Sequence, residues 1–162
     1  MSYSNPVFIP GPTNLPESVR RAINLPTIDH RSPAFAEAMP RLFAGLRSIF
    51  ATTSPHIFVF PSTGTGGWEA PIANTLSQGD KVLACRHGVF SDKWIRMCEA
   101  FGLTVDVIEC DWRGPADPAL IEAALRSDRK QSIKAVLATH NETATGVRSD
   151  PKSIRESIDR AG

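Results

Sequence analysis

Glycines and small hydroxyl side chains gather at residues 62–67, which read STGTGG, and their chemistry suits a bound phosphate. The segment lies between a predicted strand and a predicted helix. Glycine lets the backbone approach a ligand closely, and the free amides at a helix N-terminus attract an anion. Thr63, Gly64 and Thr65 are therefore candidate phosphate ligands. The segment matches neither the dinucleotide-binding fingerprint nor the P-loop, so a plain Gly-rich turn is the alternative.

A second segment, residues 86–92 (RHGVFSD), also follows a predicted strand and precedes a predicted helix. Ligands of open α/β sheets bind along the edge formed by the carboxyl ends of the strands. Phe90 could lie against a planar ring at that edge, although an aromatic residue at a helix start more often belongs to the core. His87 could titrate near neutral pH, but a single histidine is usually structural or exposed.

A third segment, residues 139–146 (THNETATG), follows the apolar run 135–138. Its polar side chains supply hydrogen-bond donors and acceptors at the end of a strand, where a ligand would sit. A polar turn without a ligand is the alternative for this segment alone. Three such segments on one edge together favour a small-molecule site.

The N-terminal residues add two further polar segments, 10–14 (PGPTN) and 29–32 (DHRS). Arg31 could clamp a carboxylate or bridge two subunits, or it could be a surface residue paired with Asp29. The prolines between residues 6 and 16 remove backbone donors and favour an extended arm or loop.

The elements that must position these segments alternate between short apolar runs and helical stretches. Strands are predicted at 57–60, 82–85, 103–108 and 135–138. Helices are predicted at 17–24, 34–51, 68–76, 90–101, 118–125 and 151–159, with a kink or restart at Pro40 and a cap at Asp117 before Pro118. Strands that are apolar on both faces and alternate with helices indicate an α/β fold with a mainly parallel sheet flanked by helices.

Composition and charge exclude several classes of protein. The 162 residues are 41% hydrophobic and 22% charged, as in soluble globular proteins. A net charge of +1 gives no reason to expect nucleic acid or an anionic membrane as a partner. No apolar run approaches the roughly 20 residues of a membrane-spanning helix, and no signal peptide is recognisable, so a cytoplasmic protein is predicted. Cys85, Cys98 and Cys110 lack C-x-x-C spacing and are expected to be buried apolar side chains, with no metal site.

Five motifs taken together resemble the class V aminotransferases, pyridoxal-phosphate enzymes of fold type I. The motifs are IPGPTN (9–14), DHRSPAF (29–35), STGTGGWEA (62–70), RHGVFSDKW (86–94) and THNETATGV (139–147). Their wording is most similar to the bacterial serine–glyoxylate aminotransferase group, and the similarity extends over essentially the whole chain. The resemblance implies an N-terminal arm and substrate-pocket loop at 1–33, followed at 34–162 by the N-terminal part of the large domain that binds pyridoxal phosphate.

The resemblance also implies roles for the matched residues of the cofactor site. Thr63, Gly64 and Thr65 would hold the phosphate of pyridoxal 5′-phosphate. Phe90 would stack on the pyridine ring. Asn141 and Thr143 would lie near its phenolic oxygen.

Substrate binding is implied for residues of the N-terminal arm. Pro10, Gly11 and Pro12 would line the substrate pocket. His30 and Arg31 would lie near the interface of a homodimer formed through the arm and the large domain. Family members complete each other's sites across that interface.

The catalytic residues of the family have no counterpart in this sequence. The family's Schiff-base lysine and the aspartate that pairs with the pyridine nitrogen are expected beyond Gly162. None of the lysines present stands in the family's Ser-x-Lys context; they are Lys81, Lys93, Lys130, Lys134 and Lys152. We therefore expect the chain to be the N-terminal part of a protein about twice as long or more, and to be inactive alone.

The activity implied for the full-length dimer is transamination between an amino donor, with L-serine expected, and glyoxylate, giving hydroxypyruvate and glycine. The substrates are then small amino acids and 2-oxo acids. Aspartate or alanine as donor is the alternative within the family, and a cysteine desulfurase fits less well. The alternative from another class is a noncatalytic phosphate-binding or interaction domain.

Overall fold

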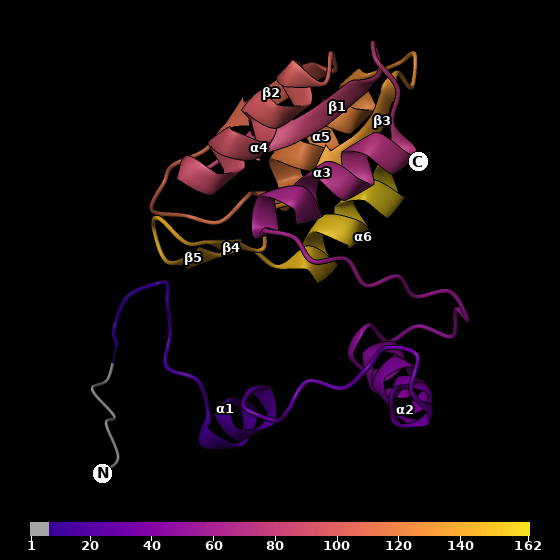
Figure 1. Ribbon diagram of the computed structural model, residues 1–162. Coiled ribbons are helices and arrows are strands. Elements are labelled where there is room, and N and C mark those ends of the chain that lie inside the picture. The colour runs from indigo at the N-terminus through magenta and orange to yellow at the C-terminus, as the bar shows by residue number, and fades with distance from the viewer. Residues whose placement is uncertain (1–6) are drawn as a thin grey trace. The chain divides into compact units, whose positions relative to one another are not determined.

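The computed structural model describes residues 7–162 and divides the chain into two compact units, Met1–Pro61 and Ser62–Gly162 (Figure 1). The first unit contains the helices α1 (Glu17–Ile23) and α2 (Pro33–Ile49). Ser32 begins α2, because its Oγ accepts a hydrogen bond from the Phe35 amide at 3.2 Å and Pro33 occupies the first helical position.

Of the kink or restart predicted at Pro40, the restart does not occur, since α2 continues through this residue without interruption. Proline lacks the amide hydrogen that would bond to the carbonyl four residues earlier, so one helical hydrogen bond is missing. The capped first turn precedes Pro40 and the remaining turns follow it, and the helix is formed on both sides.

The predicted strand at residues 57–60 is also wrong, because this apolar segment has no regular secondary structure. A strand needs a neighbour to take its backbone hydrogen bonds. The three-stranded sheet of the chain consists of other segments, and residues 57–60 pair with none of them. A run of β-favouring residues is therefore not sufficient for a strand without a neighbour to pair with.

The second unit is built around a parallel sheet with the strand order β2-β1-β3. The strands are β1 (Lys81–Arg86), β2 (Thr104–Glu109) and β3 (Ile133–Leu137). The central strand pairs in register with β2 from Lys81↔Thr104 to Arg86↔Glu109, and with β3 on its other side. The α/β class and the parallel sheet predicted from the sequence are confirmed.

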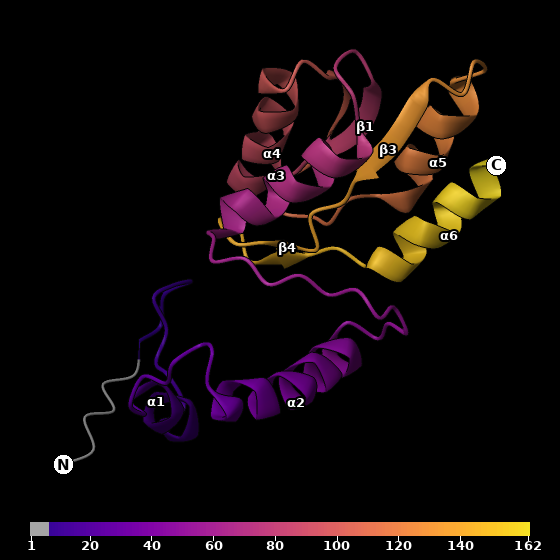
Figure 2. The same ribbon diagram turned by 45° about the vertical axis from the view of Figure 1, so that its right-hand side comes forward.

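Side chains of β1 alternate between two apolar cores, one on each face of the sheet. Val82 and Ala84 pack in one core with residues of α3 (Gly64–Thr75) and α4 (Val89–Ala100). Leu83 and Cys85 pack in the other core, with residues of α5 (Pro118–Ser127) and α6 (Pro151–Ala161). Figure 2 shows the sheet between these two pairs of helices.

Helices α5 and α6 begin where the sequence supplies side-chain caps. Asp117 Oδ1 accepts a hydrogen bond from Ala119 N at 2.8 Å, and Pro118 is the first residue of α5, as predicted. Asp150 caps α6 in the same way, accepting from Lys152 N at 3.1 Å. These caps satisfy amides that the helix itself leaves without acceptors.

The cysteines fill space in the cores, as expected for Cys85 and Cys98, which are buried, whereas Cys110 is half-buried. Burial, and then the neighbouring Cys110, raise the pKa of the Cys85 thiol to about 12. Cys85 is therefore a neutral thiol at physiological pH and acts as a small apolar side chain.

Candidate cofactor site

The Gly-rich segment forms the first turn of a helix, not a loop before it. Helix α3 begins at Gly64, four residues earlier than predicted, because Thr63 caps it. Thr63 Oγ1 accepts a hydrogen bond from Gly66 N at 3.3 Å, and the Thr63 carbonyl accepts from Gly67 N at 3.1 Å. These bonds hold the four small residues in helical conformation despite the low helix propensity of glycine.

The start of α3 leaves two amides available to an anion. Gly64 N and Thr65 N have no acceptor among the described residues, and Thr63, Gly64 and Thr65 are exposed. A Cβ on Gly64 would meet no atom within 4 Å, so the approach to this turn is open. The helix dipole adds a favourable field for negative charge at this end. The geometry suits the phosphate predicted there.

Aromatic contacts join this turn to the start of α4. The ring centroids of Trp68 in α3 and Phe90 in α4 lie 6.0 Å apart, edge to face. Trp68 also stacks on Trp94 at 5.9 Å. The structure therefore brings the first and second predicted segments together in one unit, with Phe90 half-buried between α3 and solvent.

The third segment is a short hairpin, formed by β4 (Asn141–Glu142) and β5 (Val147–Arg148). Gly146 takes a positive φ of 74° in its turn, and its amide donates to the Glu142 carbonyl at 2.8 Å. Asn141 and Thr143 are exposed on this hairpin, on either side of a fully buried Glu142.

Glu142 fastens the hairpin to α4 and was not identified from the sequence. Its carboxylate accepts hydrogen bonds from Phe90 N at 3.1 Å, Ser91 N at 2.9 Å and Ala144 N at 3.2 Å. The contact spans about 50 residues of chain, so no local pattern in the sequence indicates it. All three predicted segments are thus joined, the first to the second through Trp68 and the second to the third through Glu142.

The buried Glu142 is held as a carboxylate by its surroundings. Burial raises the pKa of this group, but the amides of Ser91, Phe90 and Ala144 together outweigh burial and hold the pKa below its ordinary value of 4.5. The negative charge lies at the N-terminus of α4, where the helix dipole stabilises it. The N-terminus of α4 is therefore already occupied by an anion, while that of α3 is open.

His87 is structural in this arrangement. Its side chain is fully buried, Nδ1 lies 3.3 Å from the Cys85 carbonyl oxygen, and its amide donates to Ser91 Oγ at 3.1 Å. The alternative that the sequence left open, of a structural histidine, is the one observed.

The residues predicted to bind substrate belong to the other unit. Pro10, Gly11, Pro12, His30 and Arg31 all lie in Met1–Pro61 and are exposed. The Arg31 amide donates to Asp29 Oδ1 at 2.9 Å, and the Asp29 carboxylate lies 3.6 Å from His30 Nδ1. Their substrate-binding role remains a prediction.

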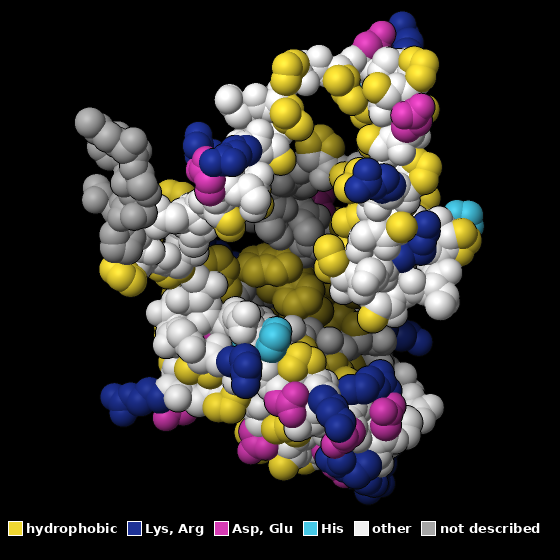
Figure 3. All heavy atoms as spheres, turned by 90° about the horizontal axis from the view of Figure 1, so that it is seen from below, with side chains coloured by type: hydrophobic (Ala, Val, Ile, Leu, Met, Phe, Trp, Pro, Cys, Tyr) yellow, Lys and Arg dark blue, Asp and Glu magenta, His cyan; other side chains and the backbone are white. Residues whose placement is uncertain are grey.

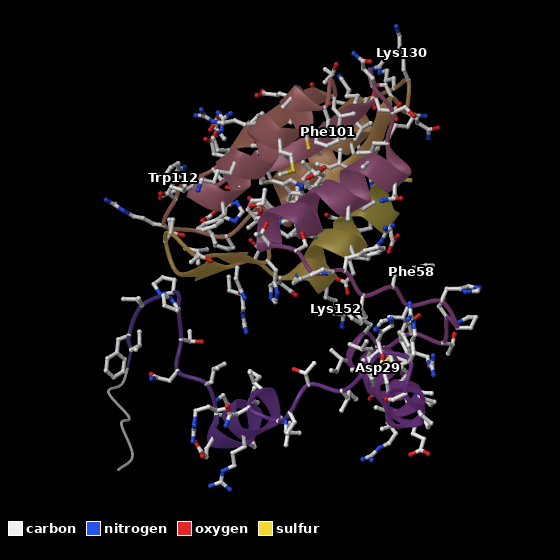
Figure 4. All side chains as sticks on the ribbon, in the orientation of Figure 1. Asp29, Phe58, Phe101, Trp112, Lys130 and Lys152 are labelled. Carbon is white, nitrogen blue, oxygen red and sulfur yellow. The ribbon has the colours of Figure 1, made fainter. Side chains whose placement is uncertain are left out.

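The lysines are distributed around the second unit. Lys81 is paired with Asp106 at 2.8 Å, and Lys93 Nζ lies 5.3 Å from the Phe90 ring centroid. Lys134 is exposed. Figure 4 shows Lys130 at the end of the sheet opposite the β4–β5 hairpin, and Lys152 near the start of α6.

The surface carries charges of both signs. Figure 3 shows basic and acidic side chains intermixed on the face it presents, in keeping with the net charge of +1. Residues 7–162 contain no group of three or more metal-ligating side chains, and no helix among them is long and apolar enough to cross a membrane.

An α/β unit with an open helix N-terminus, an aromatic ring and a polar hairpin at one end has groups that can receive a phosphate and a planar ring. The profile of the family Aminotransferase class-V matches residues 14–162, and the chain belongs to this family of pyridoxal-phosphate-dependent enzymes.

Individual relatives agree with this assignment. The chain is 51% identical, over 99% of its length, to the L-aspartate–glyoxylate aminotransferase of Paracoccus denitrificans, and 49% identical, over 98%, to the serine–glyoxylate aminotransferase of Methylorubrum extorquens. It covers 41% and 39% of those proteins, respectively. A solved alanine–glyoxylate aminotransferase from Nostoc sp. matches 95% of the chain with a TM-score of 0.81 and 30% identity, and the chain covers 40% of that structure.

Proposed function

We propose that the chain provides the phosphate-binding part of a pyridoxal-phosphate-dependent aminotransferase, which transfers the amino group of L-serine to glyoxylate and yields hydroxypyruvate and glycine. The observation that carries the proposal is the open first turn of α3, joined through Trp68 to the Phe90 ring. A phosphate and a planar ring are the two ends of this cofactor. The named relatives that transfer amino groups to glyoxylate support the same conclusion.

The residues of this unit fit the cofactor. The amides of Gly64 and Thr65 would donate to its phosphate, together with the hydroxyl groups of Thr63 and Thr65. Phe90 would pack against the ring, and Asn141 or Thr143 would hydrogen-bond to a polar ring substituent. When bound, the cofactor supplies an electron sink for the carbon that loses its proton. The chain's own residues bind and orient it.

The arm residues complete the proposal for substrate binding. Pro10, Gly11 and Pro12 would shape the substrate pocket, and His30 and Arg31 would lie at the interface of a homodimer. The guanidinium of Arg31 can bind a substrate carboxylate with two parallel hydrogen bonds. A homodimer formed through the arm and the large domain would then contain two sites.

Aspartate is the second candidate for the amino donor. The 51% identical relative from Paracoccus denitrificans is named for aspartate and glyoxylate, against 49% for a relative named for serine. These values differ too little to choose the donor, and alanine is the third candidate. Serine remains our proposal because the sequences of the five motifs are most similar to those of the serine–glyoxylate group.

The test uses the protein expressed from its natural reading frame and saturated with pyridoxal phosphate. It is mixed with glyoxylate and L-serine, L-aspartate or L-alanine in turn, and glycine and the 2-oxo acid product are measured. We expect the largest kcat/KM with L-serine, with equal amounts of glycine and hydroxypyruvate. A larger value with L-aspartate would replace serine by the second candidate, and no glycine from any donor would contradict the proposal.

A borohydride experiment separates this proposal from a noncatalytic phosphate-binding or interaction domain. The same protein is reduced in the presence of pyridoxal phosphate and digested, and the peptides are analysed by mass spectrometry. An aminotransferase yields one lysine that carries the reduced cofactor. A noncatalytic domain yields none.

A further inference from the structure

Glu142 is a buried carboxylate beside the candidate cofactor site, and no predicted role of the site accounts for it. Its side chain is fully buried and its carboxylate is bonded on two sides. Phe90 N and Ser91 N donate to it from the first turn of α4, and Ala144 N donates from the hairpin. One carboxylate therefore links two segments that are distant in sequence.

The residues on either side of this link are the ones proposed to contact the cofactor. Phe90 is itself a donor to the carboxylate, and Asn141 and Thr143 are the immediate neighbours of Glu142 in the chain. A shift of the Glu142 side chain would therefore move the ring of Phe90 relative to Asn141 and Thr143. No other hydrogen bond among the described residues joins the hairpin residues 141–146 to α4.

The packing of Glu142 against Gly88 leaves no room for a side chain at residue 88. A Cβ added to Gly88 would lie 2.2 Å from Glu142 Cγ and 2.3 Å from Cδ. The backbone of Gly88 is extended, so glycine is needed here for space and not for its conformation. The bare backbone at residue 88 lets the carboxylate reach the amides of α4.

We infer that Glu142 is a positioning residue of the cofactor site, which holds Phe90 and the Asn141–Thr143 hairpin in the alignment that binds pyridoxal phosphate. The inference rests on the proposed function. According to this inference, Glu142 does not contact the cofactor itself and acts only through the residues that do.

The test compares variants of the protein expressed from its natural reading frame, freed of cofactor and titrated with pyridoxal phosphate. In Glu142→Gln the amide NH₂ replaces one acceptor oxygen and faces backbone donors. We expect its dissociation constant for pyridoxal phosphate to rise roughly tenfold. Gly88→Ala keeps the carboxylate but displaces it, and we expect a similar rise.

Two control variants make the same kinds of substitution at positions that do not contact Glu142. Asp150→Asn makes the same change from acid to amide at the cap of α6, and Gly114→Ala adds a methyl group that meets only the Asp111 carbonyl, at 3.8 Å. Both controls should bind pyridoxal phosphate with the wild-type dissociation constant.

Amide hydrogen exchange of the cofactor-free proteins supplies the second measurement. Glu142→Gln should speed exchange at Phe90, Ser91 and Ala144 while the amides of β1 keep their protection. Gly88→Ala gives the same information if Glu142→Gln does not fold. Wild-type affinity in both variants, or unchanged exchange at these amides, would overturn the inference.

The outcome also separates this inference from the proposed function. Failure of the wild-type protein to bind pyridoxal phosphate would contradict the proposed function and the positioning role with it. Wild-type binding that is unaffected by Glu142→Gln and Gly88→Ala would contradict the positioning role alone.

Discussion

At the scale of single residues, the candidate site depends on which polar groups are already satisfied. Glu142 satisfies the first amides of α4, whereas the amides of Gly64 and Thr65 at the start of α3 have no acceptor among the described residues. Two helices that begin near each other therefore differ in what they can bind. Of these two helices, α3 is the one whose first turn has no carboxylate bound to it.

The cap of α3 is predicted to serve both the helix and the phosphate. Thr63→Ala removes the hydroxyl that accepts from Gly66 N, so we expect a loss of about 1 kcal/mol in the free energy of unfolding and weaker binding of pyridoxal phosphate. Denaturant unfolding and a cofactor titration measure the two effects. Asp117→Ala removes a cap on the opposite face of the sheet and should lower stability only. Equal cofactor affinity in Thr63→Ala and wild type would contradict the phosphate role.

The Phe90 ring is predicted to contribute to cofactor affinity by stacking. Phe90→Leu keeps an apolar side chain but removes the flat ring, so we expect the dissociation constant for pyridoxal phosphate to rise about 2- to 10-fold. Phe101→Leu makes the same change at the other end of α4, where the side chain is 40% exposed, and should leave the constant unchanged (Figure 4). A larger effect at Phe101 than at Phe90 would refute the stacking role.

At the scale of elements, the sheet positions the site because both of its faces are covered. Alternate residues of β1 enter the two cores, so β1 is held from both sides and its carboxyl end is fixed. The turn at Gly88 and the start of α4 follow directly from that end. The site thus depends on helices α5 and α6 even though no predicted cofactor ligand lies on them.

The core between the sheet and α5 is predicted to be a main source of stability. Ile121 is 1% exposed, and Ile121→Ala should lower the free energy of unfolding by about 2–5 kcal/mol through lost burial and a residual cavity. Leu120 precedes it on the same helix and is 45% exposed, so Leu120→Ala should cost much less. Urea unfolding of the two variants makes the comparison, and similar losses would show that α5 does not pack as described.

At the scale of the whole molecule, the two units differ in how their elements are stabilised. The helices of Met1–Pro61 bury no residue, whereas those of Ser62–Gly162 bury side chains against a shared sheet. The predicted cofactor ligands all lie in the second unit and the predicted substrate residues all lie in the first. The boundary predicted at residues 33 and 34 remains a prediction about the family's domains.

The stability of the molecule is predicted to fall in acid. The amides around Glu142 outweigh its burial, and the Ser153 hydroxyl and Lys152 amide act on Asp150, so both groups have a lowered pKa in the folded chain. A lowered pKa means that the stabilisation is complete above the ordinary pKa and is lost as the pH falls through the folded value. The free energy of unfolding should therefore be nearly constant from pH 7 to about 5 and decrease below pH 4.5.

Chemical unfolding between pH 7 and pH 3 measures this dependence. Glu142→Gln removes one of the titrating groups, so its curve should be flatter below pH 4.5 than that of the wild type. Stability that increases on acidification, or a variant curve parallel to that of the wild type, would contradict the assignment.

The sequence by itself determined the α/β class, the three paired strands, the cap at Asp117 and the segments at 62–67, 86–92 and 139–146. These features depend on local patterns such as apolar runs, glycine positions and residues that precede helices. The five motifs also indicated the family. The sequence misplaced a strand at 57–60, because β-favouring side chains indicate an extended backbone but not the neighbour that must pair with it.

Only the tertiary structure decided how the segments of the site are joined. A carboxylate does not reveal from its neighbours in sequence whether it will be solvated or buried against amides some 50 residues away. The fold brings Glu142 to the first turn of α4 because β1 and β3 are adjacent parallel strands whose carboxyl ends lie at the same edge. Residue 88 then has to lack a side chain, because a Cβ there would overlap the Glu142 side chain that contacts α4. The position of Glu142, on which we infer the alignment of the site depends, is therefore set by long-range packing that local propensities do not encode.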